Sequence, residues 1–326
     1  MTRATAFWVQ APGQGMLRTA EIPEPGRDDV VIRTLHTGIS RGTESLVFRG
    51  EVPVSERDRM RAPFQEGDFP GPVKYGYLNV GVVERGPSDV QGRTVYTLYP
   101  HQSEFVVPRS AVAPVPESVP ARRAVLAGTV ETAVNVLWDA APLVGDRVAV
   151  IGAGMVGCAV ARLAGGIPGA QVVVVDVDRD KAEVCERLGV AFAQPDDVPR
   201  DRDVVIDTSG SERGLQLALE SAATEGEIVE ASWFGDRSVR LELGGAFHSK
   251  RLTIRSSQVG MVSPRRRGTR STADRLALAL RLLDDPAFDA LLTGRSSWRE
   301  LPEVMAAIAS GASPGLCHTI DWGDAA

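Results

Sequence analysis

The sequence has few of the residues from which disulfide frameworks and zinc sites are built. Its 326 residues include three cysteines, Cys158, Cys185 and Cys317, and four histidines. The cysteines lie far apart, and no CxxC pair or histidine at ligand spacing accompanies them. This pattern argues against a disulfide framework and a structural zinc site. It fits a reducing compartment, and we expect a cytoplasmic protein.

Long apolar runs and an excess of positive charge are also missing. No run reaches the roughly 18 apolar residues of a membrane span, and residues 1–16 lack the apolar core of a signal peptide. The formal net charge of −6 argues against binding to a nucleic-acid backbone. Arg265, Arg266 and Arg267 form the one basic run, which is typical of a solvated loop; contact with a cofactor phosphate or a partner is the alternative.

The chain has an ordinary globular composition, with 43% hydrophobic and 24% charged residues, and it is long enough for two domains. Residues 1–125 contain short β-branched runs between glycines and prolines, such as "DVVIRTLHTGIS" and "LNVGVVERG". They predict a small all-β domain. Within it, residues 51–72 are charged and lack strand character, so we expect a long surface loop.

From residue 126 the pattern changes to strands that alternate with helices. "RVAVIGAGMVGCAVARLAGG", "AQVVVVDVDRDKAEVCERLGV" and "RDVVIDTSGSERGLQLALESA" each read as a strand followed by a helix. This alternation predicts a doubly wound parallel sheet over residues 126–262, an α/β fold. Residues 263–326 predict two amphipathic helices and a closing strand, "LCHTIDW".

Three glycines carry the strongest functional signal. Gly152, Gly154 and Gly157 form a GxGxxG motif between an apolar strand and a helix, which is typical of dinucleotide binding. The glycines permit the tight turn, the approach of the pyrophosphate and close packing of helix on strand. Asp176, about twenty residues on, is placed to accept both hydroxyls of an adenosine ribose. A 2′-phosphate would be repelled there, so the motif favours NAD(H) over NADP(H), although Arg179 and Lys181 weaken that preference.

These motifs, in this order, resemble the medium-chain dehydrogenase/reductase superfamily. "GISRGTE", "YGYLNVGVV", "HQSEFVVP", "LAGTVETAVNVL", "AVIGAGMVG" and "GEIVEASWFG" are similar to its successive segments over nearly the whole chain. The resemblance implies a GroES-like catalytic domain (1–125), a Rossmann domain (126–262) and a segment that returns to the first domain (263–326). It also implies a homodimer. Within the superfamily, the "SRGTE" stretch, interpreted as a turn, is most similar to zinc-free members of the bacteriochlorophyllide dehydrogenase type.

The departures from the family pattern concern zinc. The positions that match the zinc ligands of related enzymes are Arg41 or Ser40, Tyr77 and Gly128, and none of these is a soft or imidazole ligand. The four-cysteine lobe of those enzymes is absent as well. We therefore expect no zinc.

The resemblance assigns the cofactor contacts residue by residue. The pyrophosphate turn matches Gly152, Gly154, Met155, Val156 and Gly157, and the ribose contacts match Asp176 and Lys181. The threonine on the nicotinamide side matches Thr132. The strand ends that border the cofactor match Ser209, Gly210, Ala231, Ser232 and Trp233.

Four residues are candidates for catalysis. Reduction of a carbonyl builds negative charge on oxygen, and without a metal a hydrogen-bond donor must stabilise it. Tyr77 is the first candidate, provided that Lys74 or Arg41 lowers the pKa of its phenol; packing is the alternative. The resemblance makes Thr43 a proton-relay hydroxyl, with a turn-stabilising role as the alternative. Glu131 and His101 are weaker candidates, and structural roles are the alternative for both. Glu44 is expected to hold the turn through Arg41.

The sequence thus favours a zinc-independent NAD(H)-dependent oxidoreductase acting on a carbonyl or alcohol of a small or medium organic molecule. Two alternatives stay open. One is an enoyl or quinone reductase, which needs few catalytic side chains. The other is an NAD(H)-binding protein that has lost catalysis.

Overall fold

The computed structural model describes residues 3–323, and the chain divides into two compact units. The first unit comprises the chain up to Gly128, Leu280–Asp284 and the chain from Leu292 onward. The second comprises Thr129–Ala279 and Asp285–Leu291. Within the described residues, no helix is long and apolar enough to span a membrane.

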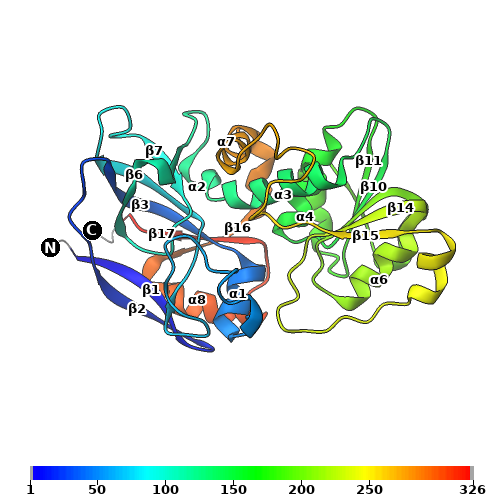
Figure 1. Cartoon of the computed structure of the whole chain (residues 1–326), viewed down its shortest axis with the longest axis horizontal. Helices are drawn as coiled ribbons and strands as arrows, with labels where there is room; N and C mark the ends of the chain where they lie inside the picture. The colour runs from blue at the N-terminus through cyan, green and yellow to red at the C-terminus, as the bar shows by residue number, and fades with distance from the viewer. Residues whose placement is uncertain (1–2, 324–326) are drawn as a thin grey trace. The chain divides into compact units, whose positions relative to one another are not determined.

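The first unit is rich in β structure (Figure 1). Its strands are β1 (Arg3–Ala11), β2 (Gln14–Glu21), β3 (Asp29–Ile39), β4 (Glu66–Gly67), β5 (Val73–Lys74), β6 (Asn79–Arg85), β7 (Thr94–Thr97), β8 (Glu104–Pro108), β9 (Val112–Pro114), β16 (Leu292–Ser297) and β17 (Cys317–Asp321). They form a four-stranded sheet, β2-β1-β5-β4, and a seven-stranded sheet, β16-β17-β3-β6-β7-β9 with β8 paired to β3. Apolar side chains that alternate along β3 and along β8 pack with single valines of β6 and β7 in the core of the larger sheet.

The C-terminal strands complete this sheet. β17 pairs antiparallel with β3, with Ile320 opposite Thr37, and β16 pairs parallel with β17. In Figure 1 the red β17 lies beside the blue β3, although the two strands are almost three hundred residues apart in the chain. Helices α1 (Arg41–Arg49), α2 (Ala121–Ala124) and α8 (Leu301–Ala309) also belong to this unit.

The second unit is a doubly wound parallel sheet. Its strands are β10 (Arg147–Ile151), β11 (Gln171–Val175), β12 (Ala191–Ala193), β13 (Arg202–Asp207), β14 (Ala222–Glu230) and β15 (Thr253–Ser256), in the order β12-β11-β10-β13-β14-β15. All neighbours are parallel. Its helices are α4 (Met155–Gly165), α5 (Lys181–Arg187), α6 (Glu212–Ser221) and most of α3 (Ala127–Ala140) and α7 (Thr272–Leu282). The runs of valine and isoleucine are continuous because both faces of a parallel sheet are buried.

The division differs from the predicted boundaries at three places. Residues 126–128 belong to the first unit, whereas residues 263–279 and 285–291, predicted to return to the first domain, belong to the second. The contacts of residues 263–279 are polar. The Ser263 amide donates to Asn135 Oδ1 on α3 at 3.1 Å, and buried Arg275 on α7 pairs with Glu131 at 3.0 Å. These contacts hold the segment on α3.

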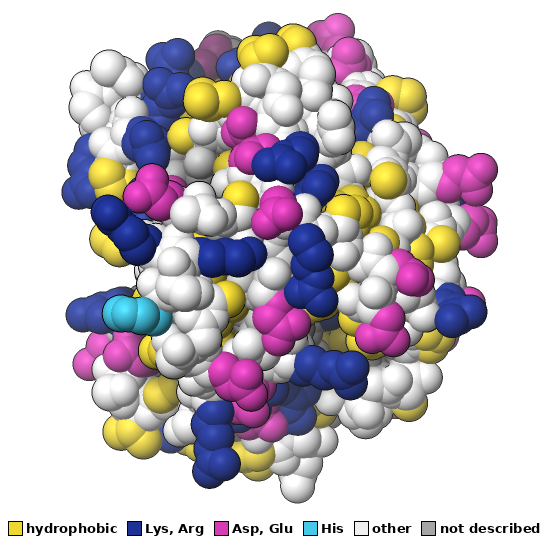
Figure 2. All heavy atoms as spheres, turned by 90° about the vertical axis from the view of Figure 1, so that its right-hand side faces the viewer, with side chains coloured by type: hydrophobic (Ala, Val, Ile, Leu, Met, Phe, Trp, Pro, Cys, Tyr) yellow, Lys and Arg dark blue, Asp and Glu magenta, His cyan; other side chains and the backbone are white. Residues whose placement is uncertain are grey.

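The surface of the molecule carries charges of both signs. Figure 2 shows Lys and Arg side chains interspersed with Asp and Glu on one face. The distribution on this face agrees with the modest net charge and shows no extended basic patch.

Candidate functional site

The glycine turn (residues 152–157) joins β10 to α4, and each of its three glycines has a different steric role. Gly152 has φ +101°, and a Cβ there would lie 2.8 Å from the Ser209 backbone. A Cβ on Gly157 would lie 2.0 Å from the Gly152 carbonyl oxygen and 2.5 Å from Thr208 Oγ1. At Gly154 nothing lies within 4 Å. The geometry thus combines a tight turn, close packing and open space, as a pyrophosphate-binding turn requires.

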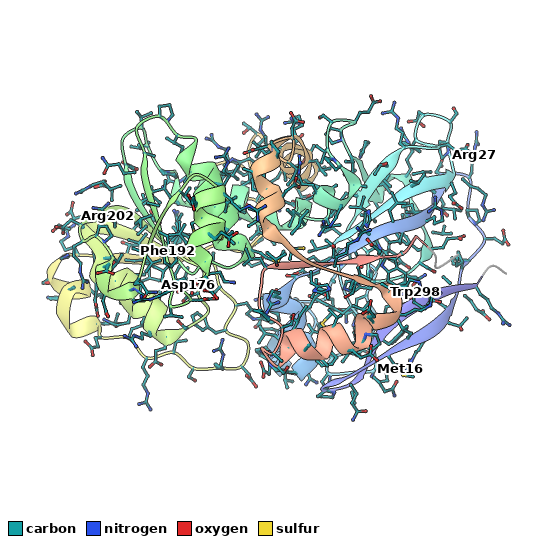
Figure 3. All side chains as sticks on the ribbon, turned by 180° about the vertical axis from the view of Figure 1, so that it is seen from behind. Met16, Arg27, Asp176, Phe192, Arg202 and Trp298 are labelled. Atoms are coloured by element: carbon teal, nitrogen blue, oxygen red, sulfur yellow. The ribbon has the colours of Figure 1, made fainter. Side chains whose placement is uncertain are left out.

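Asp176 is anchored to this turn. It follows β11 directly, and its Oδ2 accepts a hydrogen bond of 2.6 Å from the Ala153 amide. Figure 3 labels its side chain. Oδ1 accepts one of 2.9 Å from the Asp178 amide. A carboxylate has about four lone-pair sites, so capacity for two hydroxyl donors remains. The carboxylate therefore keeps the hydrogen-bonding capacity that the predicted ribose contact requires.

The cations near Asp176 have other partners. Arg179 donates to Gln194 Oε1 at 2.8 Å, and Lys181, in the first turn of α5, lies 3.7 Å from an Asp178 carboxylate oxygen. Both side chains thus contact neighbours on their own side of the sheet, which limits their use against a 2′-phosphate.

The turns after β13 and β14 are hydrogen-bonded to each other. Gly210 N donates to Ser232 Oγ at 2.9 Å, and the Ala231 amide donates to the Asp207 carbonyl at 2.9 Å. The Ser209 amide donates to Asp207 Oδ1 at 3.0 Å. Since carboxyl ends of parallel strands meet at one edge, the structure brings these residues to the edge that carries the glycine turn. Met155 is buried, whereas Val156, Thr132 and Trp233 are half-buried.

Three groups at this edge escaped the sequence analysis. Ser257 follows β15, and its amide donates to the Glu230 carbonyl at 2.8 Å. Asp207 and Glu230 are the last residues of their strands; Asp207 is fully buried and Glu230 is half-buried. The signal was present in the sequence, because "VVID" and "EIVE" each end an apolar run in an acidic residue.

Hydroxyl groups gather in the first unit at the positions that the sequence resemblance matched to zinc ligands. Tyr77 OH donates to Ser40 Oγ at 2.7 Å, and Thr43 also hydrogen-bonds to this phenol. Ser40, rather than Arg41, therefore faces Tyr77; the Arg41 guanidinium donates to the Ser313 carbonyl at 2.5 Å. We call Ser40, Thr43 and Tyr77 the hydroxyl cluster.

The third position of that set is filled. A Cβ on Gly128 would lie 2.6 Å from Leu78 Cδ2 and 2.8 Å from Tyr96 OH. The Tyr96 hydroxyl donates to the Tyr77 carbonyl at 2.8 Å, which holds it in that space. Among residues 3–323, no three His, Cys, Asp or Glu side chains are grouped to hold a metal ion. The donors at these positions do not fit zinc.

A buried polar chain lies behind the hydroxyl cluster. Glu44 and His101 are 3% and 1% exposed, and Glu44 Oε2 lies 2.9 Å from His101 Nε2. His101 Nδ1 lies 2.7 Å from Thr37 Oγ1, which accepts from Trp322 Nε1 at 3.0 Å. Because an indole only donates, one consistent arrangement of hydrogen bonds runs from Trp322 through Thr37 and His101 to Glu44 as the last acceptor. Glu44 Oε1 also accepts from the Ser40 amide at 2.8 Å.

This chain corrects several expectations. "SRGTE" is not a free turn but the start of α1, whose buried apolar residues 46–48 hold it in place. Glu44 pairs with His101 and not with Arg41. His101 is too buried to meet a substrate directly, so the structure favours its structural alternative.

The expected low pKa of Tyr77 is also wrong. Burial and, next, the nearby Glu44 raise the pKa of Tyr77 to about 12, while its hydrogen bonds with Ser40 and Thr43 act in the opposite direction. Lys74 cannot lower it, because its ammonium group pairs with Glu66 and donates to Gln102 Oε1 at 2.7 Å. Tyr77 is therefore a protonated hydrogen-bond donor at every physiological pH.

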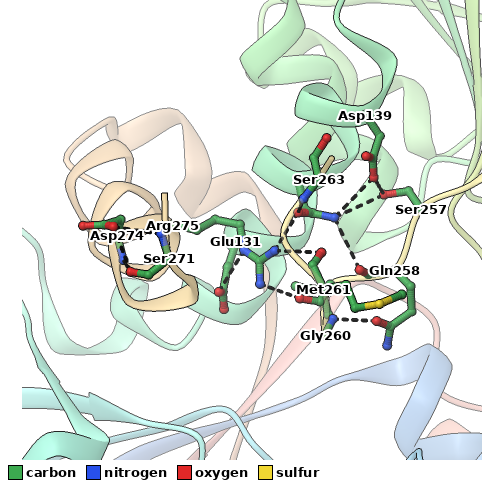
Figure 4. Close-up of polar contacts among 12 residues, drawn as sticks. Glu131, Asp139, Ser257, Gln258, Gly260, Met261, Ser263, Ser271, Asp274 and Arg275 are labelled. Atoms are coloured by element: carbon green, nitrogen blue, oxygen red, sulfur yellow. Dashed lines mark hydrogen bonds and ion pairs between the residues drawn. The ribbon is translucent and has the colours of Figure 1, made fainter. Parts of the chain in front are cut away.

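Glu131 lies in a buried network rather than facing a substrate (Figure 4). Burial raises the pKa of its carboxyl group, and the Arg275 guanidinium, 3.0 Å away, lowers it. Arg275 also donates to Asn135 Oδ1 at 2.6 Å and to the carbonyls of Val259 and Met261. The structure thus favours the structural alternative for Glu131: it neutralises the cation that ties α3 to α7.

Comparisons with known proteins bear on the fold. No family model matches the chain. The 2-desacetyl-2-hydroxyethyl bacteriochlorophyllide A dehydrogenase of Cereibacter sphaeroides is 26% identical over 252 residues, 71% of this chain and 74% of that protein. The L-idonate 5-dehydrogenase of Escherichia coli K-12 superimposes with a TM-score of 0.80 at 14% identity, covering 98% of each chain. A short chain alcohol dehydrogenase from Escherichia coli CFT073, in complex with NADH, gives a TM-score of 0.77 at 17% identity, covering 98% of this chain and all of that one.

These likenesses confirm the fold. The chain has a Rossmann-type sheet and a GroES-like β-rich unit, as the sequence motifs indicated, and shares this fold with the two dehydrogenase structures. The roles of individual residues toward a cofactor and a substrate stay predictions.

Proposed function

We propose that this protein is a zinc-independent, NAD(H)-dependent oxidoreductase that transfers hydride to or from the carbonyl or alcohol carbon of a small or medium organic molecule. The glycine turn, with Asp176 anchored to it, is the observation that carries the proposal. Open space at Gly154 and a carboxylate beside the turn fit a dinucleotide whose ribose hydroxyls are free. Proteins with the same fold hold NADH in one solved structure and NADP in another, which supports a nicotinamide dinucleotide; the choice of NAD(H) rests on Asp176.

The nicotinamide supplies the hydride chemistry when it is bound, and the chain supplies orientation and charge control. The backbone amides at the start of α4 would hold the pyrophosphate, and Asp176 would accept the ribose hydroxyls. Thr132 and the turns after β13 and β14 are the candidate contacts on the nicotinamide side. None of these roles requires a metal ion.

The hydroxyl cluster takes the place of the metal. Tyr77 carries a proton up to a pKa of about 12, and on substrate binding this proton would turn from Ser40 Oγ to the substrate oxygen throughout the working pH range. Thr43, hydrogen-bonded to the phenol, orients it. The carboxylate of Glu44 holds the Ser40 amide, and so fixes the residue to which Tyr77 donates. The zinc-independent reading rests on these donors and on the filled space at Gly128.

The substrate class follows from the relative. The name of the bacteriochlorophyllide dehydrogenase specifies a hydroxyethyl group, and we propose an alcohol of that kind, or its carbonyl counterpart, as the substrate of this chain.

Two assays test the proposal. NADH and NADPH are titrated by nucleotide fluorescence, and alcohol–carbonyl pairs such as isopropanol and acetone or benzyl alcohol and benzaldehyde are screened with and without a chelator. We expect tighter binding of NADH than of NADPH and chelator-resistant turnover that Tyr77→Phe reduces. Turnover of enones alone would favour an enoyl or quinone reductase. Nucleotide binding without turnover of any substrate would favour an NAD(H)-binding protein that has lost catalysis.

A further inference from the structure

Two acidic residues end adjacent strands at the cofactor edge of the second unit. Asp207 is the last residue of β13, Glu230 is the last residue of β14, and the two are opposite each other in the strand register. Asp207 is completely buried and Glu230 half-buried. We call them the carboxyl pair. None of the roles proposed above uses it.

Each carboxyl group holds the turn that follows its own strand. Asp207 Oδ1 accepts from the Ser209 amide at 3.0 Å, and Glu230 Oε1 accepts from the Ser232 amide at 2.5 Å. The hydrogen bond from Gly210 N to Ser232 Oγ then joins the two turns. These are the turns that the sequence assigned to the cofactor.

The second oxygen of each group has no donor. Asp207 Oδ2 and Glu230 Oε2 are buried without a hydrogen-bond partner, and the two side chains interact directly. Two ionised carboxylates in this arrangement would face each other with no hydrogen between them, which is costly for buried groups. A single proton between the two oxygens satisfies both.

The surrounding charges do not provide another solution. On the neighbouring strands, Ile151 of β10 and Ser256 of β15 are uncharged, and Arg255 of β15 pairs with Glu227 at 2.6 Å. In the segments around the two turns, Arg237 donates to the Gly210 carbonyl at 3.0 Å and Glu212 of α6 accepts from the Arg240 amide. Throughout residues 3–323, no cation makes a hydrogen bond or ion pair with either carboxyl group of the pair.

We propose that Asp207 and Glu230 hold one proton between them and that this shared proton positions the two turns that border the cofactor. The inference rests on the proposed NAD(H)-binding function. Loss of the proton leaves two facing anions, which separate the strand ends and weaken the Gly210–Ser232 bond. Both residues are positioning residues, because they act on the cofactor through the turns and not by contact.

The pH range in which this happens follows from the environment of the pair. Burial, and then the contact with Asp207, raise the pKa of Glu230 to about 9, against hydrogen bonds from Ser232. Burial also raises the pKa of Asp207. The proton is therefore present at neutral pH and leaves in the alkaline range.

The test compares four proteins: the wild type, Glu230→Gln, Asp207→Asn and the matched control Glu227→Gln. The control changes a glutamate of the same strand that pairs with Arg255. An amide at position 230 or 207 donates to the facing carboxylate and so replaces the shared proton with a permanent hydrogen bond. The dissociation constant for NADH is measured by fluorescence from about pH 7 to 10, and infrared spectra of the nucleotide-free proteins report protonated carboxyl groups.

We expect the wild type and Glu227→Gln to bind NADH about tenfold more weakly at pH 10 than at pH 7, because one proton with a pKa near 9 must be retained. The two amide variants change by less than about twofold over that range. A protonated carboxyl band is present at neutral pH in the wild type and the control and is absent in Glu230→Gln.

Two results would overturn the proposal. One is a wild-type spectrum without the band at neutral pH. The other is an NADH profile of Glu230→Gln that coincides with that of the wild type; the proposed function would survive both. If the wild type binds neither nicotinamide nucleotide at any pH, the proposed function fails and the positioning role fails with it, even where the band is present.

Discussion

Substitutions at two glycines of the glycine turn should have different effects, because Gly154 has open space around it and Gly157 is tightly packed. In Gly154→Ala the new methyl group meets nothing within 4 Å, whereas in Gly157→Ala it lies 2.0 Å from a backbone carbonyl. Gly154 has φ −77°, which alanine adopts without strain. The first variant should therefore change ligand binding alone, and the second should change the fold.

The magnitudes follow from these contacts. Gly154→Ala should alter the free energy of unfolding by less than about 0.5 kcal/mol, as for other open sites. Its methyl group displaces the pyrophosphate from an amide, and loss of one charge-assisted hydrogen bond costs about 1.5–3 kcal/mol, or roughly 10- to 100-fold in the dissociation constant. Gly157→Ala overpacks the turn, which costs about 1–3 kcal/mol of stability.

Chemical denaturation and NADH titration of both variants measure these effects, with Gly268→Ala as the control. Gly268 also has open space around it but lies in the arginine-rich loop, so its variant should match the wild type in both assays. Wild-type NADH affinity in Gly154→Ala would refute the reasoning, because a methyl group in the proposed pyrophosphate space cannot be harmless.

Other substitutions test the roles of the two units individually. Tyr77→Phe should lower kcat by about 10- to 100-fold at unchanged NADH affinity, since it removes one hydrogen-bond donor to the substrate oxygen; equal kcat would show that the phenol only packs. Glu44→Gln should destabilise the first unit by about 1–3 kcal/mol, measured by denaturation, because it weakens a buried pair with His101. Asp176→Ala should weaken NADH binding and narrow the preference over NADPH in parallel titrations. Finally, the raised pKa of Glu230 means that the folded state holds a proton more tightly than the unfolded state. Wild-type stability should fall as the pH rises from about 4.5 to 9, and melting curves of Glu230→Gln should fall less over that window.

The secondary structure of the second unit could be predicted from local sequence patterns. An apolar strand, a glycine motif and a helix with its apolar face inward are all encoded within about thirty residues, and their geometry hardly depends on distant segments. The glycine turn and the acidic residue after β11 therefore lie where the sequence put them.

The hydrogen-bond and ion-pair partners of the side chains could not be predicted in this way. Arg41 and Lys74 were expected near the Tyr77 phenol, but long flexible side chains pair with whatever the tertiary fold brings within reach, here Ser313, Glu66 and Gln102. Similarly, the sequence around Glu131 does not indicate its ion pair with Arg275, which is 144 residues away in the chain. The helical start of α1 was missed because "GISRGTES" has turn-forming composition, whereas burial of the following apolar residues decides its conformation.

The measurement that tests the central claim most directly is an NADH titration of protein whose zinc content has been determined in the same sample. We predict saturable binding of one nucleotide per chain at a zinc content well below one atom per chain. One zinc atom per chain held by the first unit, or no binding of NADH, would contradict the account.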